Sequence, residues 1–489
     1  MNGLLTKENF LHTLRMLANV PAVGSDSLGY LPHLVYLKRI SDEAGADSDF
    51  LSRAGLMLPD ECRWEYFMAS PRLNDELLLV FRRIVQENPE MWGDVPLRMV
   101  LPGSIVHVTR RDEWERHRGL PGVDGEEVLR YAVRVLSGIS LAERDCAAPD
   151  VVSSAFEQYV RETSEFSSPS GLFTCPCLPE DVTSVAASVL DIRDGMSVMD
   201  PFCEIGDLLM AAKQQCPGCS VRGSEFTDLQ AMLSQIRLHL SGDFSARVSG
   251  GDVLRFPILD EKGGLARADR VITRIVDPPE DTHPRTLMTD PFGRFDRYNG
   301  SSGTVSAMTY VCHALASLKS GGRCVAVDSS RVLLRTRMRV PERVTLLVDD
   351  LLEAVIQIPG LGLRRSADVS WNILVFSRKK PENRQRKVLF VDASTLPEET
   401  RVSEVSRIVA DFAELSGVSR VVDLEEVLCN DAVLSVRSYT TVLQTAPRMD
   451  MEAAYEELAK LEAEAQVLRE LLKASVQGLM KLKEEGNKN

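Results

Sequence analysis

The chain has 489 residues, of which 44% are hydrophobic and 26% are charged. These values are typical of soluble proteins, and the length is enough for roughly three domains. We find no apolar run long enough to cross a bilayer and no signal peptide, so a cytoplasmic protein is expected. The formal net charge of −14 argues against a protein that binds DNA alone, because contacts to phosphate dominate such binding. A local basic face or another subunit would have to supply those contacts.

Ten cysteines in a chain without a secretory signal predict reduced thiols. Two pairs, Cys175 with Cys177 and Cys216 with Cys219, suggest a four-thiolate zinc site as an alternative. Their spacing differs from the usual zinc-binding spacing, and we therefore predict no metal.

The first 145 residues are predicted to be mostly helical. Phe10, Leu14 and Leu17 recur at helical spacing, which is typical of one buried helix face. Leu31–Asp42 is predicted to form a further helix, and the segment Leu58-Pro-Asp-Glu-Cys-Arg-Trp64 follows it. Neither segment carries chemistry, so both indicate a packing role.

A strand, a tight turn and a helix are predicted between Met196 and Ala212. The apolar entry indicates a buried strand, and Pro201 ends it because proline has no N–H to donate to a neighbouring strand. A strand–loop–helix unit directs backbone N–H groups toward a ligand. The loop over residues 200–207 is therefore a candidate ligand site.

Acidic residues follow the next predicted elements. The strand over 221–225 ends in Glu225, roughly 20 residues after the loop, where a carboxylate that binds a ribose is expected. A helix over 229–240 ends at Ser241-Gly242, and the turn Gly251-Asp252-Val253-Leu254 lies beyond it. Both acidic residues could also be ordinary polar residues at strand ends.

A strand over 271–277 is broken by a double proline in the sequence Asp277-Pro278-Pro279-Glu280. A surface loop is expected over 281–303. Beyond it, helices over 304–318 and 344–352 alternate with strands over 321–327, 352–359, 370–376 and 387–394. This alternation predicts an α/β fold with a mostly parallel sheet and helices on both faces.

Residues 450–485 show the clearest helical pattern of the chain. Apolar or small residues alternate spacings of three and four, which indicates a coiled-coil seam that packs against a partner chain or a second copy. A helix that folds back on its own chain is the alternative. The seam consists of Leu458, Leu461, Ala465, Leu468, Leu472, Ser475, Leu479 and Leu482.

Taken together, these segments resemble the modification subunits of type I restriction-modification systems, which are N6-adenine DNA methyltransferases. The loop over 200–209 resembles the family's Asp-Pro-x-x-Gly-x-Gly/Ala-Gly-Phe-Leu, which wraps S-adenosylmethionine (SAM). Gly171-Leu-Phe-Thr174 is similar to the loop that closes over the methionine end of SAM. Asp277-Pro278-Pro279 resembles the Asn/Asp-Pro-Pro-aromatic motif of amino-methyltransferases.

The resemblance implies three domains. They are a helical N-terminal domain over 1–145, a Rossmann-like SAM-dependent methyltransferase domain over 146–445 and a C-terminal coiled-coil helix over 446–489. It also implies SAM as the cofactor and DNA as the substrate, reached through a DNA-specificity subunit that meets the C-terminal region.

The resemblance also implies the site residues. In the family, the Asn or Asp of the Pro-Pro motif and a proline-fixed carbonyl hold the adenine amine toward the methyl group, while the aromatic residue stacks on the flipped base. Here the catalytic residues would be Asp277, Pro278, Pro279 and Glu280. The cofactor-binding residues would be Thr174, Asp200, Phe202, Glu204, Gly206, Glu225 and Asp252, of which Asp252 would bind the adenine amine of SAM.

Three residues depart from the family's pattern. Glu204 and Asp207 occupy positions of glycine, and Glu280 occupies the position of the aromatic residue. Glycine lets the backbone pass close to the cofactor, and a carboxylate there would repel the carboxylate of SAM. These departures favour a second hypothesis, a catalytically silent scaffold or a DNA- or partner-binding subunit of a restriction or defence complex. A SAM-dependent enzyme that acts on a protein or a small molecule is a third, which the Asp-Pro-Pro segment disfavours.

Overall fold

The computed structural model of the chain describes residues 3–19, 24–92, 125–164, 177–275, 290–297, 307–328, 340–360 and 370–440, with Lys460 and Gln466. The chain forms two compact units, 1–440 and 441–489, and nearly all of the described residues belong to the first. The predicted domain boundary after residue 145 lies within that first unit and stays a prediction. None of the helices in the described ranges is long and apolar enough to span a membrane.

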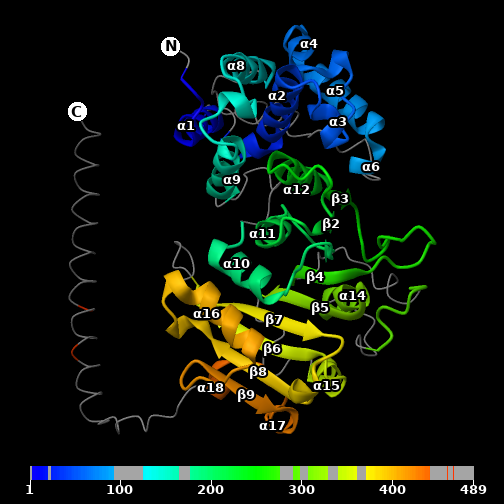
Figure 1. Cartoon of the computed structure of the whole chain (residues 1–489), viewed down its shortest axis with the longest axis vertical. Coiled ribbons are helices and arrows are strands. Elements are labelled where there is room, and N and C mark those ends of the chain that lie inside the picture. The colour runs from blue at the N-terminus through cyan, green and yellow to red at the C-terminus, as the bar shows by residue number, and fades with distance from the viewer. Residues whose placement is uncertain are drawn as a thin grey trace, which may run out of the picture. The chain divides into compact units, whose positions relative to one another are not determined.

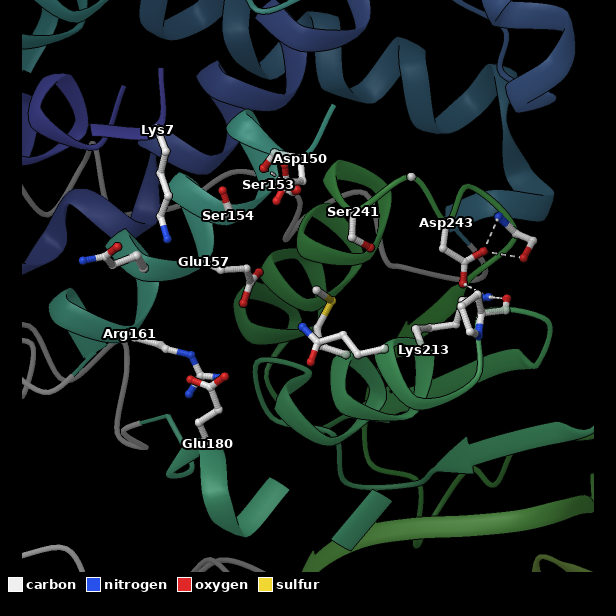
Figure 2. A pocket seen from close by; sticks show the side chains of 16 residues that line it. Lys7, Asp150, Ser153, Ser154, Glu157, Arg161, Glu180, Lys213, Ser241 and Asp243 are labelled. Atoms are coloured by element: carbon white, nitrogen blue, oxygen red, sulfur yellow. Dashed lines mark hydrogen bonds and ion pairs between the residues drawn. The ribbon is translucent and has the colours of Figure 1, made fainter. Parts of the chain in front are cut away.

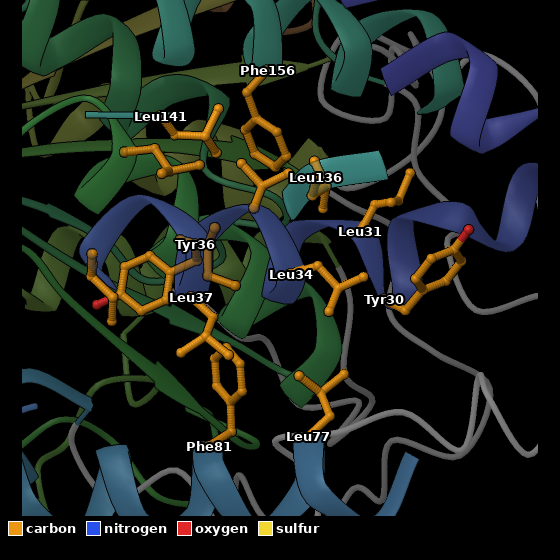
Figure 3. Packing of buried hydrophobic residues seen from close by; sticks show 14 of the residues in the cluster. Tyr30, Leu31, Leu34, Tyr36, Leu37, Leu77, Phe81, Leu136, Leu141 and Phe156 are labelled. Carbon is orange, nitrogen blue, oxygen red and sulfur yellow. The ribbon is translucent and has the colours of Figure 1, made fainter. Parts of the chain in front are cut away.

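Helices form the N-terminal part of the first unit, as the apolar spacing predicts (Figure 1). Their centre is α2 (Leu31–Ala46), whose Leu34 and Leu37 pack among Leu77, Phe81 and Leu136 (Figure 3). The other helices here are α1 (Lys7–Ala18), η1 (Gly24–Gly29), α3 (Phe50–Ala54), η2 (Asp60–Cys62), α4 (Trp64–Met68), α5 (Leu73–Glu87), α6 (Pro89–Trp92), α8 (Gly125–Ser137), η3 (Glu143–Asp145) and α9 (Val151–Ser164).

A nine-stranded sheet follows, with the strand order β3-β2-β1-β4-β5-β7-β6-β8-β9. Five of the eight neighbouring pairs are parallel, which confirms the mostly parallel sheet. The strand β7 runs antiparallel to β5 and β6, and β9 runs antiparallel to β8. The strands are β1 (Ser197–Asp200), β2 (Ser220–Glu225), β3 (Arg247–Gly250), β4 (Ala268–Ile275), β5 (Leu318–Asp328), β6 (Leu352–Ile358), β7 (Trp371–Ser377), β8 (Lys387–Asp392) and β9 (Ser419–Asp423).

Helices cover both faces of the sheet because successive side chains of each strand point to opposite faces. On β5, Val325 and Val327 join the core formed with α10 (Glu180–Val189), α11 (Asp207–Gln215) and α16 (Glu398–Asp411). Cys324 and Ala326 join the opposite core. That core includes α14 (Ala307–Ala316), α15 (Val340–Val348), α17 (Leu424–Cys429) and α18 (Arg437–Thr440), and the remaining short helices are η4 (Glu382–Arg384) and η5 (Ala393–Thr395).

One helix, α12 (Asp228–Leu240), joins the N-terminal helices to the sheet, and every one of its residues is buried. Leu233 and Ile236 pack into the core of the N-terminal helices, while Leu238 packs into the core beneath the sheet. At its end, His239 Nδ1 lies 3.1 Å from the hydroxyl of Tyr36 on α2. The residues that follow β1 are therefore held between the sheet and the N-terminal helices.

Two predicted boundaries are wrong. The helix predicted to reach Leu318 ends at Ala316, and Leu318 begins β5. The helix predicted to reach Leu352 ends at Val348, and Leu352 begins β6. Before Leu318 only Ser317 interrupts the apolar residues, so the end of the buried helix is hard to distinguish from the start of the buried strand. Before Leu352 the polar pair Asp349-Asp350 marks the end of the helix, and the prediction overlooked it.

Candidate functional site

The strand order defines where a ligand would bind. From β1 the chain builds outward to β2 and β3 on one side, and β4 and β5 lie on the other side of β1. The point at which the order reverses is therefore between β1 and β4, which are parallel neighbours. Ligands of doubly wound sheets bind outside the carboxyl ends of the strands at such a switch point. The loop after β1 and the end of β4 meet there.

Asp200 ends β1 and is 1% exposed. Its Oδ1 accepts a hydrogen bond of 3.1 Å from the backbone N–H of Phe202. Burial raises the pKa of Asp200 to about 8, so the neutral carboxyl predominates at neutral pH. The ring of Phe202 packs edge-on against Tyr310, with 4.4 Å between the ring centroids. Asp200 and Phe202 thus fix the first turn of the loop through these contacts.

Glu204 forms an ion pair across the switch point. Its Oε2 lies 2.8 Å from Nη1 of Arg274, which is near the carboxyl end of β4. The guanidinium of Arg274 also lies over the ring of Trp371, 5.6 Å from its centroid. Among the described residues, the buried Oε1 of Glu204 has no hydrogen-bond partner. The negative charge that was predicted to repel a cofactor is thus compensated by an arginine of the same chain.

The backbone of this loop turns twice into the left-handed region, at Glu204 with φ 49° and at Gly206 with φ 91°. A Cβ on Gly206 would lie 2.4 Å from Oγ of Ser234 on α12, so only glycine fits there. At Glu204 the same region is adopted by a residue with a side chain, which carries backbone strain. The prediction of a tight loop is confirmed, and the contact that requires Gly206 is with α12.

Asp207 begins α11, and its side chain contacts α12 and the segment before α10. Its Oδ2 accepts a hydrogen bond of 2.7 Å from the N–H of Leu178, and its Oδ1 lies 2.8 Å from Nη2 of Arg237. Arg237 also pairs with Glu157 at 2.6 Å. The expectation that Asp207 places a free charge against the cofactor is therefore wrong, because this carboxylate is paired with α12.

The two other predicted cofactor residues lie at the adjacent strand ends. Glu225, the last residue of β2, accepts N–H groups of Glu204 at 3.0 Å and Thr227 at 2.9 Å. Burial raises the pKa of Glu225 to about 7. Asp252 lies just beyond β3, and its Oδ1 accepts the N–H of Leu254 at 3.0 Å. A hydrogen bond of 2.8 Å from Gly251 N–H to the carbonyl of Glu225 connects the two ends.

Sequence reasoning missed two arginines at this edge. Arg274 is a charged residue next to Ile275 at the carboxyl end of β4, and a charge at that position was a usable signal. Arg294 donates to the carbonyls of Val253 and Leu254 and so holds the turn of Asp252. It also pairs with Asp290 at 2.8 Å, in the segment that was expected to be a surface loop. The sequence contains no pattern that would predict this contact.

Several predicted residues lie outside the described residues: Thr174, Cys175, the catalytic set Asp277, Pro278, Pro279 and Glu280, and most of 450–485. No group of three or more metal-ligating side chains occurs in the ranges that the structure describes. Of the cysteine pairs, Cys216 and Cys219 are buried thiols. The Sγ of Cys216 lies 3.2 Å from Oδ1 of Asp194.

A groove of about 870 Å³ lies between α9 and the helices α11 and α12, away from the switch point (Figure 2). Its lining includes none of the predicted cofactor residues. Lys213 is engaged by Asp243 at 3.1 Å and by two backbone carbonyls, and Arg161 donates to the carbonyl of Leu178. Because none of the predicted cofactor residues line it, this groove is not the candidate site.

The fold defines a doubly wound α/β protein whose switch point lies between β1 and β4, with acidic residues at the neighbouring strand ends. The chain belongs to the N-6 DNA methylase family, whose family model matches residues 147–447. This result confirms the family that the sequence motifs indicated.

Curated relatives support the assignment along most of the chain. The MjaVIII methylase subunit of a type I restriction enzyme from Methanocaldococcus jannaschii is 25% identical over 424 residues, which are 81% of this chain and 72% of that protein. The MjaIX methylase subunit from the same organism is 21% identical and covers 88% of this chain and 79% of its own length.

Solved structures show the same fold. The methyltransferase subunit of a type I restriction-modification system from Streptococcus thermophilus superposes with a TM-score of 0.66 at 15% identity, covering 90% of this chain and all of that chain. A chain from a study of complex assembly of the type I restriction-modification system has a TM-score of 0.58 at 19% identity, covering 95% and 97%. The α/β methyltransferase architecture that the motifs implied is confirmed.

Proposed function

We propose that this chain is a modification subunit that transfers a methyl group from SAM to the N6 amine of adenine in DNA, together with a DNA-specificity subunit. The observation that carries this proposal is the placement of Glu225 and Asp252. Both lie at the carboxyl ends of neighbouring parallel strands, beside the switch point between β1 and β4. The names of the relatives, which are methylase subunits of type I restriction enzymes, support the same reaction and the same kind of assembly.

The residues at this edge fit an adenosine group. The carboxylate oxygens of Glu225 and Asp252 retain lone pairs beyond those used by backbone N–H groups, so they can accept from ribose hydroxyls and from an adenine amine. The raised pKa values of Asp200 and Glu225 reduce the negative charge that the carboxylate of SAM would meet. SAM, when bound, supplies an electrophilic methyl group on sulfur. The ion pair between Glu204 and Arg274 has to open or shift to admit it.

For the methyl-accepting side, we keep the assignment of Asp277, Pro278 and Pro279. Asp277 follows Ile275, the last residue of β4, by two positions. In this role its side chain accepts a hydrogen bond from the adenine amine and orients the nitrogen lone pair toward the methyl group. Glu280 cannot stack on the base as an aromatic residue would, so the flipped adenine needs another contact.

A second function, a silent methyltransferase-fold scaffold, is favoured by one observation. The ion pair between Glu204 and Arg274 connects the two chain segments between which a cofactor would enter. If this pair stays closed, the chain retains the architecture and its partners without methyl transfer. The two functions differ in one measurable property, the binding of SAM.

Calorimetric titration of the full chain with SAM distinguishes them. The enzyme proposal predicts saturable binding, weakened at least about tenfold in Glu225→Gln and in Asp252→Asn because each loses an anionic acceptor. The exposed Glu61→Gln is the matched control and should bind as the natural chain does. No heat at about 1 mM SAM would instead support the scaffold.

The transfer step is tested with methyl-labelled SAM, DNA that contains adenine, and a DNA-specificity subunit that binds this chain. Asp277→Ala should abolish labelling of the DNA while SAM still binds. Labelling that persists in this variant would show that another residue orients the amine.

We further propose that 450–485 contacts the partner chain through its heptad seam. Deletion of residues 450–489 should then release the specificity subunit, or dissociate a homo-oligomer, in light scattering. An unchanged mass, both alone and with the partner, would show that the contact lies elsewhere.

A further inference from the structure

A pocket of about 460 Å³ lies at the end of the strands opposite to the switch point. It is bounded by the amino-terminal parts of β4 and β5, the end of β7, and the helices α10 and α16, which pack together (Figure 1). Five cationic and two acidic side chains line it, an excess of three positive charges in a chain whose net charge is −14. The cations are Arg193, Arg270, Arg323, Lys379 and Arg384.

Two of these arginines carry like charges at paired positions of neighbouring strands. Arg270 and Arg323 are register partners on the parallel strands β4 and β5. Like charges on directly opposed strand positions repel each other, and here the side chain of Arg270 is only 11% exposed. Burial and the neighbouring Arg323 hold the pKa of Arg270 below its usual range. Backbone carbonyls hold both side chains at this end of the strands: Arg270 donates to those of Leu190 and Asp191, and Arg323 to that of Val189.

The acidic residues of the pocket do not balance the cations. Oε1 of Glu353 pairs with Arg384 at 2.8 Å and also with Arg323, so one oxygen serves two guanidiniums. Oδ2 of Asp191 is likewise shared by Arg193 and Arg270, at 3.2 Å from each. Lys379 is exposed and pairs with none of the described acidic residues. The buried Nε of Arg384 donates to none of the described acceptors.

We propose that this pocket binds a small phosphate-bearing anion. Guanidinium groups present forked N–H donors that match phosphate oxygens, and several of them converge on a cavity whose volume is within the range of small-molecule sites. DNA held for methylation at the carboxyl edge would lie at the other end of the strands. A soluble phosphate compound is therefore favoured over a phosphate of the DNA backbone. This preference for a soluble compound rests on the methyl-transfer proposal, whereas the cationic pocket itself does not.

Inorganic pyrophosphate is the probe, titrated calorimetrically into the full chain at constant ionic strength. The double variant Arg193→Ala/Lys379→Ala removes two exposed cations of the pocket and leaves its buried pairs in place. It should weaken pyrophosphate binding at least about tenfold, because it removes charge-assisted contacts. Arg72→Ala, an exposed cation on the N-terminal helices, is the matched control and should change nothing. Thermal unfolding of all variants checks that each folds as the natural chain does.

Three results would overturn the proposal. The first is no saturable binding up to about 10 mM pyrophosphate. The second is an equal loss of affinity in Arg72→Ala, which would indicate general charge screening. The third is binding of a short DNA duplex, if pyrophosphate displaces the duplex and the double variant abolishes its binding. That result would assign the pocket to the nucleic acid. The SAM titration remains unaffected by any of them, so the two proposals fail separately.

Discussion

Two groups of buried charges flank the loop after β1, and they differ in the number of partners that their central residue has. At the junction with α12, Arg237 has a fully buried side chain that pairs with Glu157 and Asp207 and donates to the carbonyl of Ile205. At the switch point, Glu204 uses one oxygen on Arg274, and its other oxygen lacks a hydrogen bond among the described residues.

The difference suggests that the charges at the α12 junction stabilise the fold, whereas those at the switch point serve function. Arg237 pairs with two carboxylates at once, and this network at the α12 junction holds the loop in place. Incompletely paired groups, left-handed backbone and raised pKa values concentrate at sites that bind or react. The switch point has all three features, at Glu204, Asp200 and Glu225. The following changes test this contrast, from the largest expected effect to the smallest.

Arg237→Ala should lower the free energy of unfolding by about 3–5 kcal/mol, because it leaves the buried Asp207 and the partly buried Glu157 without their partner. Chemical denaturation of the full chain measures the loss. The control is Arg15→Ala, which removes an exposed ion pair with Glu162 and should cost less than about 1 kcal/mol. Equal losses in the two variants would contradict a special role for the α12 junction.

Asp200→Asn should change the pH dependence of stability. The pKa of Asp200 is raised to about 8 in the folded chain from an ordinary value of 3.8, so its contribution is fully present at low pH and is lost as the pH rises through about 8. The variant should therefore gain stability relative to the natural chain as the pH rises from about 4 to about 8.5.

Glu225→Gln is the companion variant for this measurement. Because the folded pKa of Glu225 is raised to about 7, the gain should have the same sign and be complete at a lower pH. A stability difference that does not vary with pH in either variant would show that these carboxylates ionise normally in the folded chain.

Glu204→Gly should raise the affinity for SAM by about tenfold, since it removes the left-handed strain and opens the ion pair at the switch point. Asp207→Gly is the matched change at the other glycine position of the family. It should lower stability without a gain in SAM affinity, because Asp207 pairs with Arg237. Calorimetry and thermal unfolding of both variants measure the two effects. Tighter SAM binding in Asp207→Gly alone would reverse our assignment of the two carboxylates.

Tyr36→Phe should cost about 1 kcal/mol, the net value of one buried hydrogen bond to His239. Urea denaturation checks it. Tyr66→Phe, an exposed tyrosine on α4, is the control and should be neutral. An effect as large as that of Arg237→Ala would mean that this contact, and not the charge network, holds α12.

The order of strands and helices could be predicted from the sequence because it depends on local patterns. Apolar runs, a helix-ending glycine and the prolines after β1 determine where β1, β2 and α12 begin or end, within a few residues. The acidic strand ends Glu225 and Asp252 were predictable for the same reason, since a strand and the residue after it are neighbours in the chain. The boundary before Leu318 was not, because only Ser317 separates two apolar runs, and the boundary before Leu352 was missed although Asp349-Asp350 marks it.

The partners of the charged residues could not be predicted in this way. Glu204 and Asp207 are three positions apart and looked equivalent in the sequence, yet they pair with arginines on different elements. The anion pocket depends equally on distant residues, since Arg270 and Arg323 become neighbours only when β4 and β5 pair.

By itself the sequence determined the class of fold, the family and the strand ends that carry the candidate cofactor residues. Only the tertiary structure decided which carboxylate stabilises the junction and which one lies across the switch point. The physical reason is that secondary structure follows from side chains near one another in the chain, whereas the cost and the use of a buried charge depend on the partner that folding brings to it.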